Sequence, residues 1–176
     1  SVNGVSYTGM VAADLVEIVI PAGDLQSLVD GDIYTAVADV ADAAGNDAEQ
    51  QSISFEVDIT APSITSLTLS FTDVLNSSED DSDGTVSVVT AGAEDGQTVI
   101  IGLNGVIYTG TVATGAVTVT IPVDDLQALV DGDTYTVTAD IADAAGTSAV
   151  QQSTTFVVDT SAPVITLGQI FSYSEN

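Results

Sequence analysis

The stretch Asp58-Ile59-Thr60-Ala61-Pro62 returns 101 positions later as Asp159-Thr160-Ser161-Ala162-Pro163. Proline fixes its own φ and keeps the preceding residue extended, so each copy predicts a stiff, acidic joint between domains. Residues 3–62 align without a gap on residues 104–163, and more than half of the aligned positions are identical. A period of about a hundred residues is that of a whole domain in a tandem array, not of a solenoid turn.

The charge of the chain is entirely of one sign. Its 176 residues include 26 Asp and Glu but no Lys, Arg, His or Cys, which gives a formal charge of -26. Nucleic acid is excluded as a partner because phosphate binding relies on Lys and Arg. An anionic membrane surface would repel the chain, and without a transmembrane run or lipidation motif we expect no direct membrane insertion. The hydrophobic fraction of 45% is β-branched and periodic, which favours a folded chain over a disordered one.

Folding brings these like charges closer together, and their repulsion destabilises the compact state unless something neutralises it. High salt is one such agent, since it shortens the Debye length to about 3 Å near 1 M. Bound divalent cations are the other. Both agents indicate a saline, calcium-containing exterior.

Residues 61–161 have the pattern of one complete all-β domain. Strict alternation predicts a first strand over residues 63–71, and an acidic loop follows over residues 73–83. Asn104-Gly105 between apolar runs predicts a type I′ hairpin. Asp124 and Asp125 are placed to cap a short helical turn. The remaining strands are expected over residues 84–90, 97–101, 106–112, 115–121, 135–141 and 150–158. Seven strands in about a hundred residues predict an immunoglobulin-like, Greek-key β-sandwich.

Residues 1–60 match only the later part of this unit. They have no counterpart of residues 61–101, so this partial repeat lacks its first three strands and has open edges. Either these residues belong to a longer chain, or another chain supplies the strands by strand exchange. Residues 162–176 depart from the repeat after a few positions, so we expect a linker and the start of a following module.

A longer motif suggests a family. Tyr135-Thr136-x-x-Ala139-Asp140 is followed by Ala142-Asp143-Ala144-Ala145-Gly146, and the last strand ends in Val158-Asp159 before the Ala162-Pro163 joint. This pattern resembles the bacterial Ig-like extender repeats of large calcium-dependent RTX-type surface adhesins. The resemblance implies a non-enzymatic, extracellular module on the bacterial surface, secreted by the type I route. Such repeats, stiffened by calcium, project a binding tip away from the cell.

The resemblance also implies calcium at the joints, and the residues agree with it. A sandwich is entered at one end and left at the other, so the joint at Asp159 should meet acidic loops of its own domain. Residues 171–176 resemble the start of a cadherin-like domain, whose Glu reaches calcium at the joint. Calcium takes six to eight oxygen ligands. The candidate ligands are Asp58, Asp159, Asp30, Asp32, Asp131, Asp133, Asp73, Glu79, Asp81, Asp83, Glu94, Asp95, Asp143 and Glu175.

Each candidate also has a purely structural interpretation. The acidic run over residues 79–84 lacks the distal Glu of an EF-hand loop, and a solvated loop explains it equally well. Asp131-Gly132-Asp133 and its copy Asp30-Gly31-Asp32 have turn chemistry. Asp143 is also suited to satisfy backbone groups of its turn. Asp58 and Asp159 have few other partners, so they are the favoured ligands.

Catalysis is not expected. Without His, Cys, Lys or Arg, no Ser or Thr has a usual activating base. The recurring Tyr7, Tyr34, Tyr108 and Tyr135 are typical of core or corner residues, and no regular Thr-x-Thr ladder suggests an ice-binding face. Three hypotheses remain: a calcium-stiffened extender that contacts neighbouring repeats, a calcium-assisted module that binds a glycan or protein, and an acidic spacer of a secreted halophile enzyme.

Overall fold

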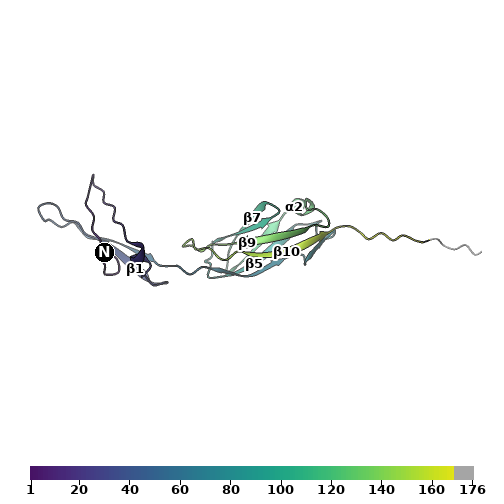
Figure 1. The fold of residues 1–176 in the computed structure, drawn as a ribbon, viewed down its shortest axis with the longest axis horizontal. Helices are drawn as coiled ribbons and strands as arrows, with labels where there is room; N and C mark the ends of the chain where they lie inside the picture. Colours follow the sequence, from purple (N-terminus) through teal and green to yellow (C-terminus); the bar gives the residue numbers. More distant parts are fainter. Residues whose placement is uncertain (169–176) are drawn as a thin grey trace, which may run out of the picture. The chain divides into compact units, whose positions relative to one another are not determined.

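The computed structural model describes residues 1–168, which fall into two compact units: Ser1–Thr60, called unit 1, and the chain from Ala61 onward, called unit 2. Unit 1 contains α1 (Ala22–Leu25), β1 (Ile33–Ala38) and β2 (Gln51–Glu56). Unit 2 contains β3 (Ser63–Leu69), β4 (Val74–Asn76), β5 (Gly84–Ala91), β6 (Thr98–Leu103), β7 (Val106–Thr111), β8 (Ala116–Ile121), α2 (Val123–Gln127), β9 (Thr134–Asp140) and β10 (Gln152–Asp159) (Figure 1).

Unit 2 is a sandwich of two sheets. One sheet has the strand order β3-β5-β8, and the other has the order β4-β10-β9-β6-β7. All pairs are antiparallel except β4 with β10, which run in the same direction. The sequence-based prediction of an all-β, immunoglobulin-like fold is confirmed. In the five-stranded sheet, β4 comes first in the chain and β10 comes last, and these two strands are parallel. The chain enters unit 2 at one end and leaves it at the other (Figure 1).

The core of unit 2 follows from strand alternation. In β5, the residues at positions 84, 86, 88 and 90 are buried and the intervening ones are more exposed, as a half-buried strand requires. Phe71 and Phe156 meet edge to face at the centre, with ring centroids 4.9 Å apart. An edge-to-face pair adds about 0.5–1.5 kcal/mol beyond its buried area. The apolar faces of the two sheets therefore supply the stabilisation that no disulfide provides.

Two local expectations were wrong. The loop over residues 73–83 contains a further strand, β4, so unit 2 has eight strands where seven were expected. β4 is only three residues long and polar residues flank it, so alternation could not reveal it. Asp124 and Asp125 do not cap α2: its N-cap is Pro122, without a side-chain cap. The Val123 N–H instead donates to Asp83 Oδ1 at 2.9 Å.

The hairpin and corner expectations are confirmed. Asn104 and Gly105 have φ of 48° and 79° in the turn between β6 and β7. The Val130 N–H donates to the hydroxyl of Tyr135 at 2.9 Å, and the Val29 N–H donates to that of Tyr34 at 3.0 Å. A Tyr near the start of a late strand that binds backbone a few residues upstream is the tyrosine corner of immunoglobulin-like folds.

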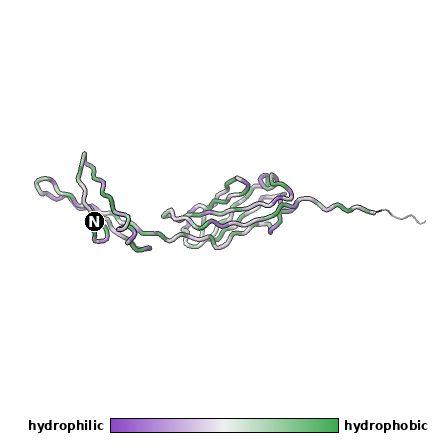
Figure 2. The backbone as a smooth tube through the Cα atoms, viewed as in Figure 1, coloured by the Kyte–Doolittle hydropathy of each residue, from purple (hydrophilic) through white to green (hydrophobic). Residues whose placement is uncertain are grey.

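Unit 1 is much more open. β1 and β2 form a two-stranded antiparallel sheet, with Tyr34 opposite Phe55. Figure 2 shows hydrophobic segments along the extended arms of this unit. Two strands alone bury too little apolar surface for a stable core.

Within residues 1–168, no helix has the length and apolar character needed to cross a membrane.

Gly110 provides a test of the packing in unit 2. A Cβ at this position would lie 2.6 Å from Val117 Cγ2 and 2.8 Å from Val119 Cγ2. We expect Gly110→Ala to lower the free energy of unfolding by about 1–3 kcal/mol, because an added methyl overpacks this contact. Urea unfolding followed by circular dichroism measures the change. Gly168→Ala, where the methyl meets open space, is the control. Equal stability of the two variants would contradict this packing.

Candidate functional site

The end of β10 is fixed to an acidic loop of its own unit. Asp131 accepts hydrogen bonds from the Thr160 N–H, at 2.7 Å through Oδ1, and from the Ser161 hydroxyl. The Gly132 N–H donates to the Val158 carbonyl at 2.8 Å, and the Val158 N–H donates to the Asp133 carbonyl at 2.9 Å. We call this arrangement, residues 131–133 with residues 158–161, the exit clamp of unit 2.

The same arrangement recurs in unit 1. Asp30 accepts from the Ile59 N–H at 2.7 Å and from the Thr60 hydroxyl at 2.5 Å. The Gly31 N–H donates to the Val57 carbonyl at 2.7 Å, as the equivalent pair does in unit 2. Each Asp-Gly-Asp loop therefore contacts the joint segment of its own unit, as expected from the sequence. The exit clamp of unit 1 consists of residues 30–32 with residues 57–60.

The hydrogen bonds of the clamps favour the ionised carboxylates. The Ile59 N–H, followed by the Thr60 hydroxyl, holds the pKa of Asp30 below its ordinary value of 3.8. The Ser161 hydroxyl, followed by the Thr160 N–H, does the same for the pKa of Asp131. Donors to a carboxylate lower its pKa because they stabilise the charged form more than the neutral form.

The turn after β9 contains a carboxylate in a different situation. Asp143 is only 3% exposed, and its Oδ1 accepts from the Thr147 N–H at 2.7 Å. Its Oδ2 is buried and has no hydrogen-bond partner in residues 1–168. The neighbouring Ala144 N–H donates to Glu94 Oε2 at 3.0 Å. Burying a carboxylate oxygen without a partner is costly, so this oxygen is the strongest indication of a missing ligand.

The equivalent turn of unit 1 shows what is missing. Asp42 Oδ1 accepts from the Ala44 and Asn46 N–H groups, and Oδ2 accepts from Asn46 Nδ2 at 2.8 Å. The Asn46 side chain is the main cause that lowers the pKa of Asp42. Thr147 stands at the position equivalent to Asn46, so the side-chain donor is absent beside Asp143. One substitution between the copies therefore leaves the second carboxylate oxygen without its partner.

Four further candidate ligands, Asp58, Glu79, Asp83 and Asp95, accept hydrogen bonds through their side chains. Glu79 Oε2 accepts from the Asn76 backbone N–H at 3.1 Å and from its side-chain amide at 2.6 Å. Asp95 accepts from the Thr114 N–H at 2.6 Å, and Asp58 accepts from the Thr60 N–H at 3.3 Å. These carboxylates satisfy backbone donors of turns and loops.

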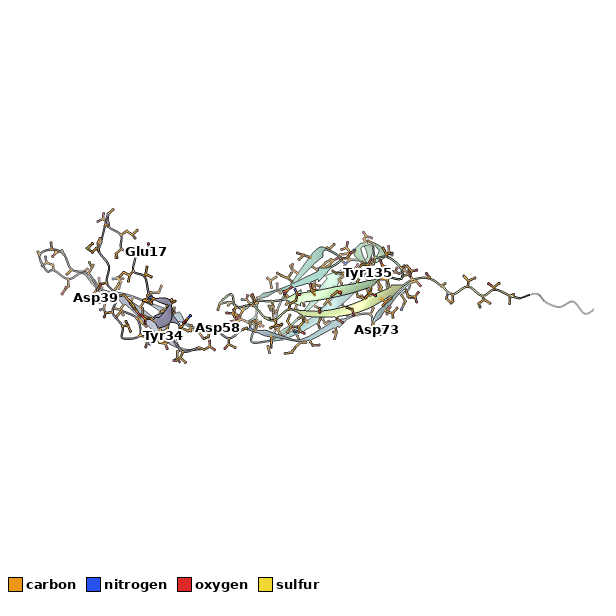
Figure 3. All side chains as sticks on the ribbon, viewed as in Figure 1. Glu17, Tyr34, Asp39, Asp58, Asp73 and Tyr135 are labelled. Atoms are coloured by element: carbon orange, nitrogen blue, oxygen red, sulfur yellow. The ribbon has the colours of Figure 1, made fainter. Side chains whose placement is uncertain are left out.

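The remaining candidates are exposed at the surface. Asp73 lies at the end of the sandwich where β10 ends (Figure 3), and its carbonyl accepts from the Val157 N–H at 2.9 Å. The exposed candidates are Asp32, Asp73, Asp81, Asp133 and Asp159. Glu175 lies outside the described residues. Within residues 1–168, no three acidic side chains come together as a metal-binding group.

A recurring Tyr–Asp pair was not recognised in the sequence. The Tyr108 hydroxyl donates to Asp125 at 2.9 Å, and Tyr7 donates to Asp24 at 3.0 Å in unit 1. Burial, together with the bond to Asp125, raises the pKa of Tyr108 to about 12. The constant spacing of Tyr and Asp in both copies was a signal that could have revealed the pair.

The solved structures that resemble this chain include domains of bacterial ice-binding adhesins. A bacterial immunoglobulin-like domain of the M. primoryensis ice-binding adhesin shares 30% identity, over 53% of this chain and 96% of that domain, with a TM-score of 0.39. A Ca2+-stabilised adhesin with which an Antarctic bacterium binds ice shares 32% identity, over 92% of this chain and 40% of that structure, with a TM-score of 0.49. A 1.5-MDa bacterial ice-binding adhesin shares 28% identity, over 73% of this chain and 42% of that structure, with a TM-score of 0.42.

The shared sequence defines the family. The strand order of unit 2 defines the class, an immunoglobulin-like sandwich. The sequence identity of 30% over almost all of a bacterial immunoglobulin-like domain shows the family. The TM-scores, which are below 0.5, do not contribute to this assignment. The chain belongs to the bacterial immunoglobulin-like repeats of large adhesins, as the sequence motif suggested. It spans about two fifths of the two longer structures. No protein-family model and no curated protein sequence matches it.

The exit clamps predict a specific pH dependence. The pKa values of Asp30 and Asp131 are lower in the folded chain than in the unfolded chain. The clamps therefore contribute fully to folding stability at pH values above the unfolded pKa. Their contribution is lost as the pH falls through the folded pKa. We expect the amide NMR shifts of Ile59 and Thr160 to titrate with midpoints below 3.8. In Asp131→Asn the Thr160 titration should vanish while that of Ile59 persists. Midpoints at or above 3.8 would contradict the clamps.

Proposed function

We propose that this chain is a structural extender segment of a bacterial cell-surface adhesin, stiffened by calcium, that helps to project a distal binding domain. The observation that carries the proposal is the buried Oδ2 of Asp143, which lacks a partner in a chain without any side-chain cation. An extender needs length, a fixed exit and resistance to its own charge.

The topology of unit 2 suits an extender. The chain enters at one end of the sandwich and leaves at the other, because β4 and β10 are parallel. Each such domain therefore adds the length of its strands to a string of domains. Repetition of the same sequence pattern in both copies is what an array built for length requires.

The exit clamp supports stiffness within each unit. Thr160 and Ser161 follow the last strand and both bind Asp131, so the chain leaves unit 2 in a defined direction. Ala162-Pro163 comes next and restricts the backbone further. The same features in unit 1, from Asp30 to Pro62, indicate that the device belongs to the repeat.

Asp143 fits a calcium ligand best among the candidates. Its Oδ2 is buried without a partner, and Glu94, from the loop between β5 and β6, contacts the same turn by accepting from the Ala144 N–H. Calcium bound here would draw further oxygen ligands from backbone carbonyls and water, since it takes six to eight. When bound, calcium supplies two positive charges to a site where the protein supplies only negative ones.

The joint acids remain proposed calcium ligands as well. Asp133 and Asp159 belong to the exit clamp of unit 2 and are exposed; in the exit clamp of unit 1, Asp32 is exposed and Asp58 is half-buried. In one similar adhesin calcium stabilises the protein, and that property is carried over here as a proposal. Extracellular calcium modules bind at about 10⁻⁴–10⁻³ M, so millimolar calcium outside the cell would occupy them partly or fully.

Removal of calcium should destabilise the chain through Asp143. At a hundred times its dissociation constant, one bound ion adds roughly 2.7 kcal/mol to stability. We expect EGTA to lower the melting temperature at fixed ionic strength. Asp143→Asn removes the unpaired charge, so the variant should melt at the parent's temperature or above it in EGTA. In calcium the parent should melt at a higher temperature than the variant, so calcium reverses the order of the two melting temperatures.

The control for this reversal is Asp124→Asn, which removes the same charge from an exposed carboxylate whose side chain accepts no hydrogen bond within residues 1–168. It should keep the calcium response of the parent. If Asp143→Asn is more stable than the parent both with and without calcium, Asp143 holds no ion. If NaCl alone restores stability and calcium adds nothing, the chain is an acidic spacer. Specific retention on a glycan array would favour the ligand-binding alternative.

A further inference from the structure

Two turns with nearly the same sequence hold their acidic side chains differently. Residues 41–46 of unit 1 read Ala-Asp-Ala-Ala-Gly-Asn, and residues 142–147 of unit 2 read Ala-Asp-Ala-Ala-Gly-Thr. Only the sixth residue differs, and it is Asn46 in unit 1 and Thr147 in unit 2. Within the turn itself, the two copies therefore differ by a single side chain.

The backbone of the two turns is the same. The Asp42 N–H donates to the Asn46 carbonyl at 3.0 Å, and the Asp143 N–H donates to the Thr147 carbonyl at 3.1 Å. The glycine before the sixth residue has a φ of 89° in both copies. Its N–H donates to the carbonyl of Asp42 at 3.0 Å in unit 1 and to that of Asp143 at 3.1 Å in unit 2. Because this backbone holds Asn in unit 1, the turn of unit 2 has the conformation that Asn requires.

In unit 1 the side chain of the sixth residue closes the turn. Asn46 Nδ2 donates to Asp42 Oδ2 at 2.8 Å, while the N–H groups of Ala44 and Asn46 donate to Oδ1. Hydrogen bonds to an ionised acceptor are roughly twice as strong as those between neutral groups. Both oxygens of Asp42 are therefore satisfied by donors of the turn itself, without an ion.

In unit 2 the sixth residue leaves the turn open. The Thr147 N–H donates to Asp143 Oδ1 at 2.7 Å, but the Thr147 hydroxyl does not reach Oδ2, which has no partner within residues 1–168. The hydroxyl of Thr is carried on Cβ, whereas the amide nitrogen of Asn is one bond further out. Asp143 is only 3% exposed, so bulk water has little access to the unpaired oxygen.

A second carboxylate is held at the open turn. Glu94 Oε2 accepts from the Ala144 N–H at 3.0 Å, directly beside Asp143 in the sequence. Two acids at one turn repel each other, and the chain has no Lys, Arg or His to offset them. A divalent cation offsets this repulsion and also gives the unpaired oxygen a partner. The open turn therefore favours a cation in two ways.

We propose that the sixth residue decides whether this turn takes up a divalent cation: Asn closes the turn on itself, whereas Thr147 leaves Oδ2 of Asp143 available to the ion. The inference rests on the proposed calcium site at Asp143. Thr147 is not a ligand in this account. It acts by withholding an amide N–H that would compete with the ion for the lone pairs of the same oxygen.

The two units therefore contain two forms of one turn. The turn of unit 1 is complete without an ion, because Asn46 supplies the last donor. The turn of unit 2 is complete only with an ion, because Thr147 supplies none to Oδ2. A change at this one position alters the dependence of a repeat on calcium while it leaves the rest of the turn sequence unchanged.

The test replaces the sixth residue of unit 2 in the full chain. Backbone amide resonances of residues 143–149, followed by NMR during a calcium titration at fixed ionic strength, report on this turn alone. We expect Thr147→Asn to raise the calcium concentration at the midpoint by at least about tenfold, because the ion must displace a hydrogen bond to a charged group. In EGTA the same variant should melt at a higher temperature than the parent, because Oδ2 gains a donor.

The matched control is Thr147→Val, which keeps the shape of the side chain and adds no amide. It should titrate with calcium as the parent does. A Thr147→Asn variant that binds calcium as tightly as the parent would overturn the inference. So would a Thr147→Val variant that binds as weakly as Thr147→Asn, because the hydroxyl would then be what matters. If these resonances of the parent do not respond to calcium, the proposed calcium site itself is wrong, and the role of Thr147 is excluded with it.

Discussion

The structure depends on how a chain with 26 carboxylates and no side-chain cation keeps its negative charge tolerable. With no Lys or Arg, carboxylates are stabilised by N–H and O–H donors of turns and loops. Asp131 takes donors from Thr160 and Ser161, and Glu79 takes both donors of Asn76. These bonds place acids at the ends of the sandwich, where loops have free N–H groups. The apolar faces of the sheets are thus left free of charge.

Donors of the chain do not satisfy every oxygen. Asp42 has the Asn46 amide beside it, but Asp143 has Thr147 at that position and keeps a buried oxygen without a partner. The two copies of the repeat therefore provide an internal comparison: both carboxylate oxygens of Asp42 have hydrogen-bond partners, whereas Oδ2 of Asp143 has none in residues 1–168. A divalent cation has the right charge for this oxygen and would also relieve repulsion in the surrounding loops.

Sequence reasoning succeeded where the signal was local or repeated. Asn104-Gly105 predicted its hairpin because only a few residue pairs tolerate positive φ at both positions. Strand alternation predicted most of the strands because the alternation of polar and apolar residues repeats along each of them. β4 was missed because three residues carry no period, and the donor from Val123 to Asp83 depends on two loops far apart in sequence. Which carboxylate lacks a partner depends on packing, and only coordinates could reveal it.

The central claim is that a cation binds the buried carboxylate of Asp143 in unit 2. Anomalous diffraction from crystals of the full chain grown in calcium tests it most directly. The account predicts a peak about 2.3–2.6 Å from Oδ2 of Asp143. A well-ordered Asp143 with only a water, or nothing, at that position would contradict it.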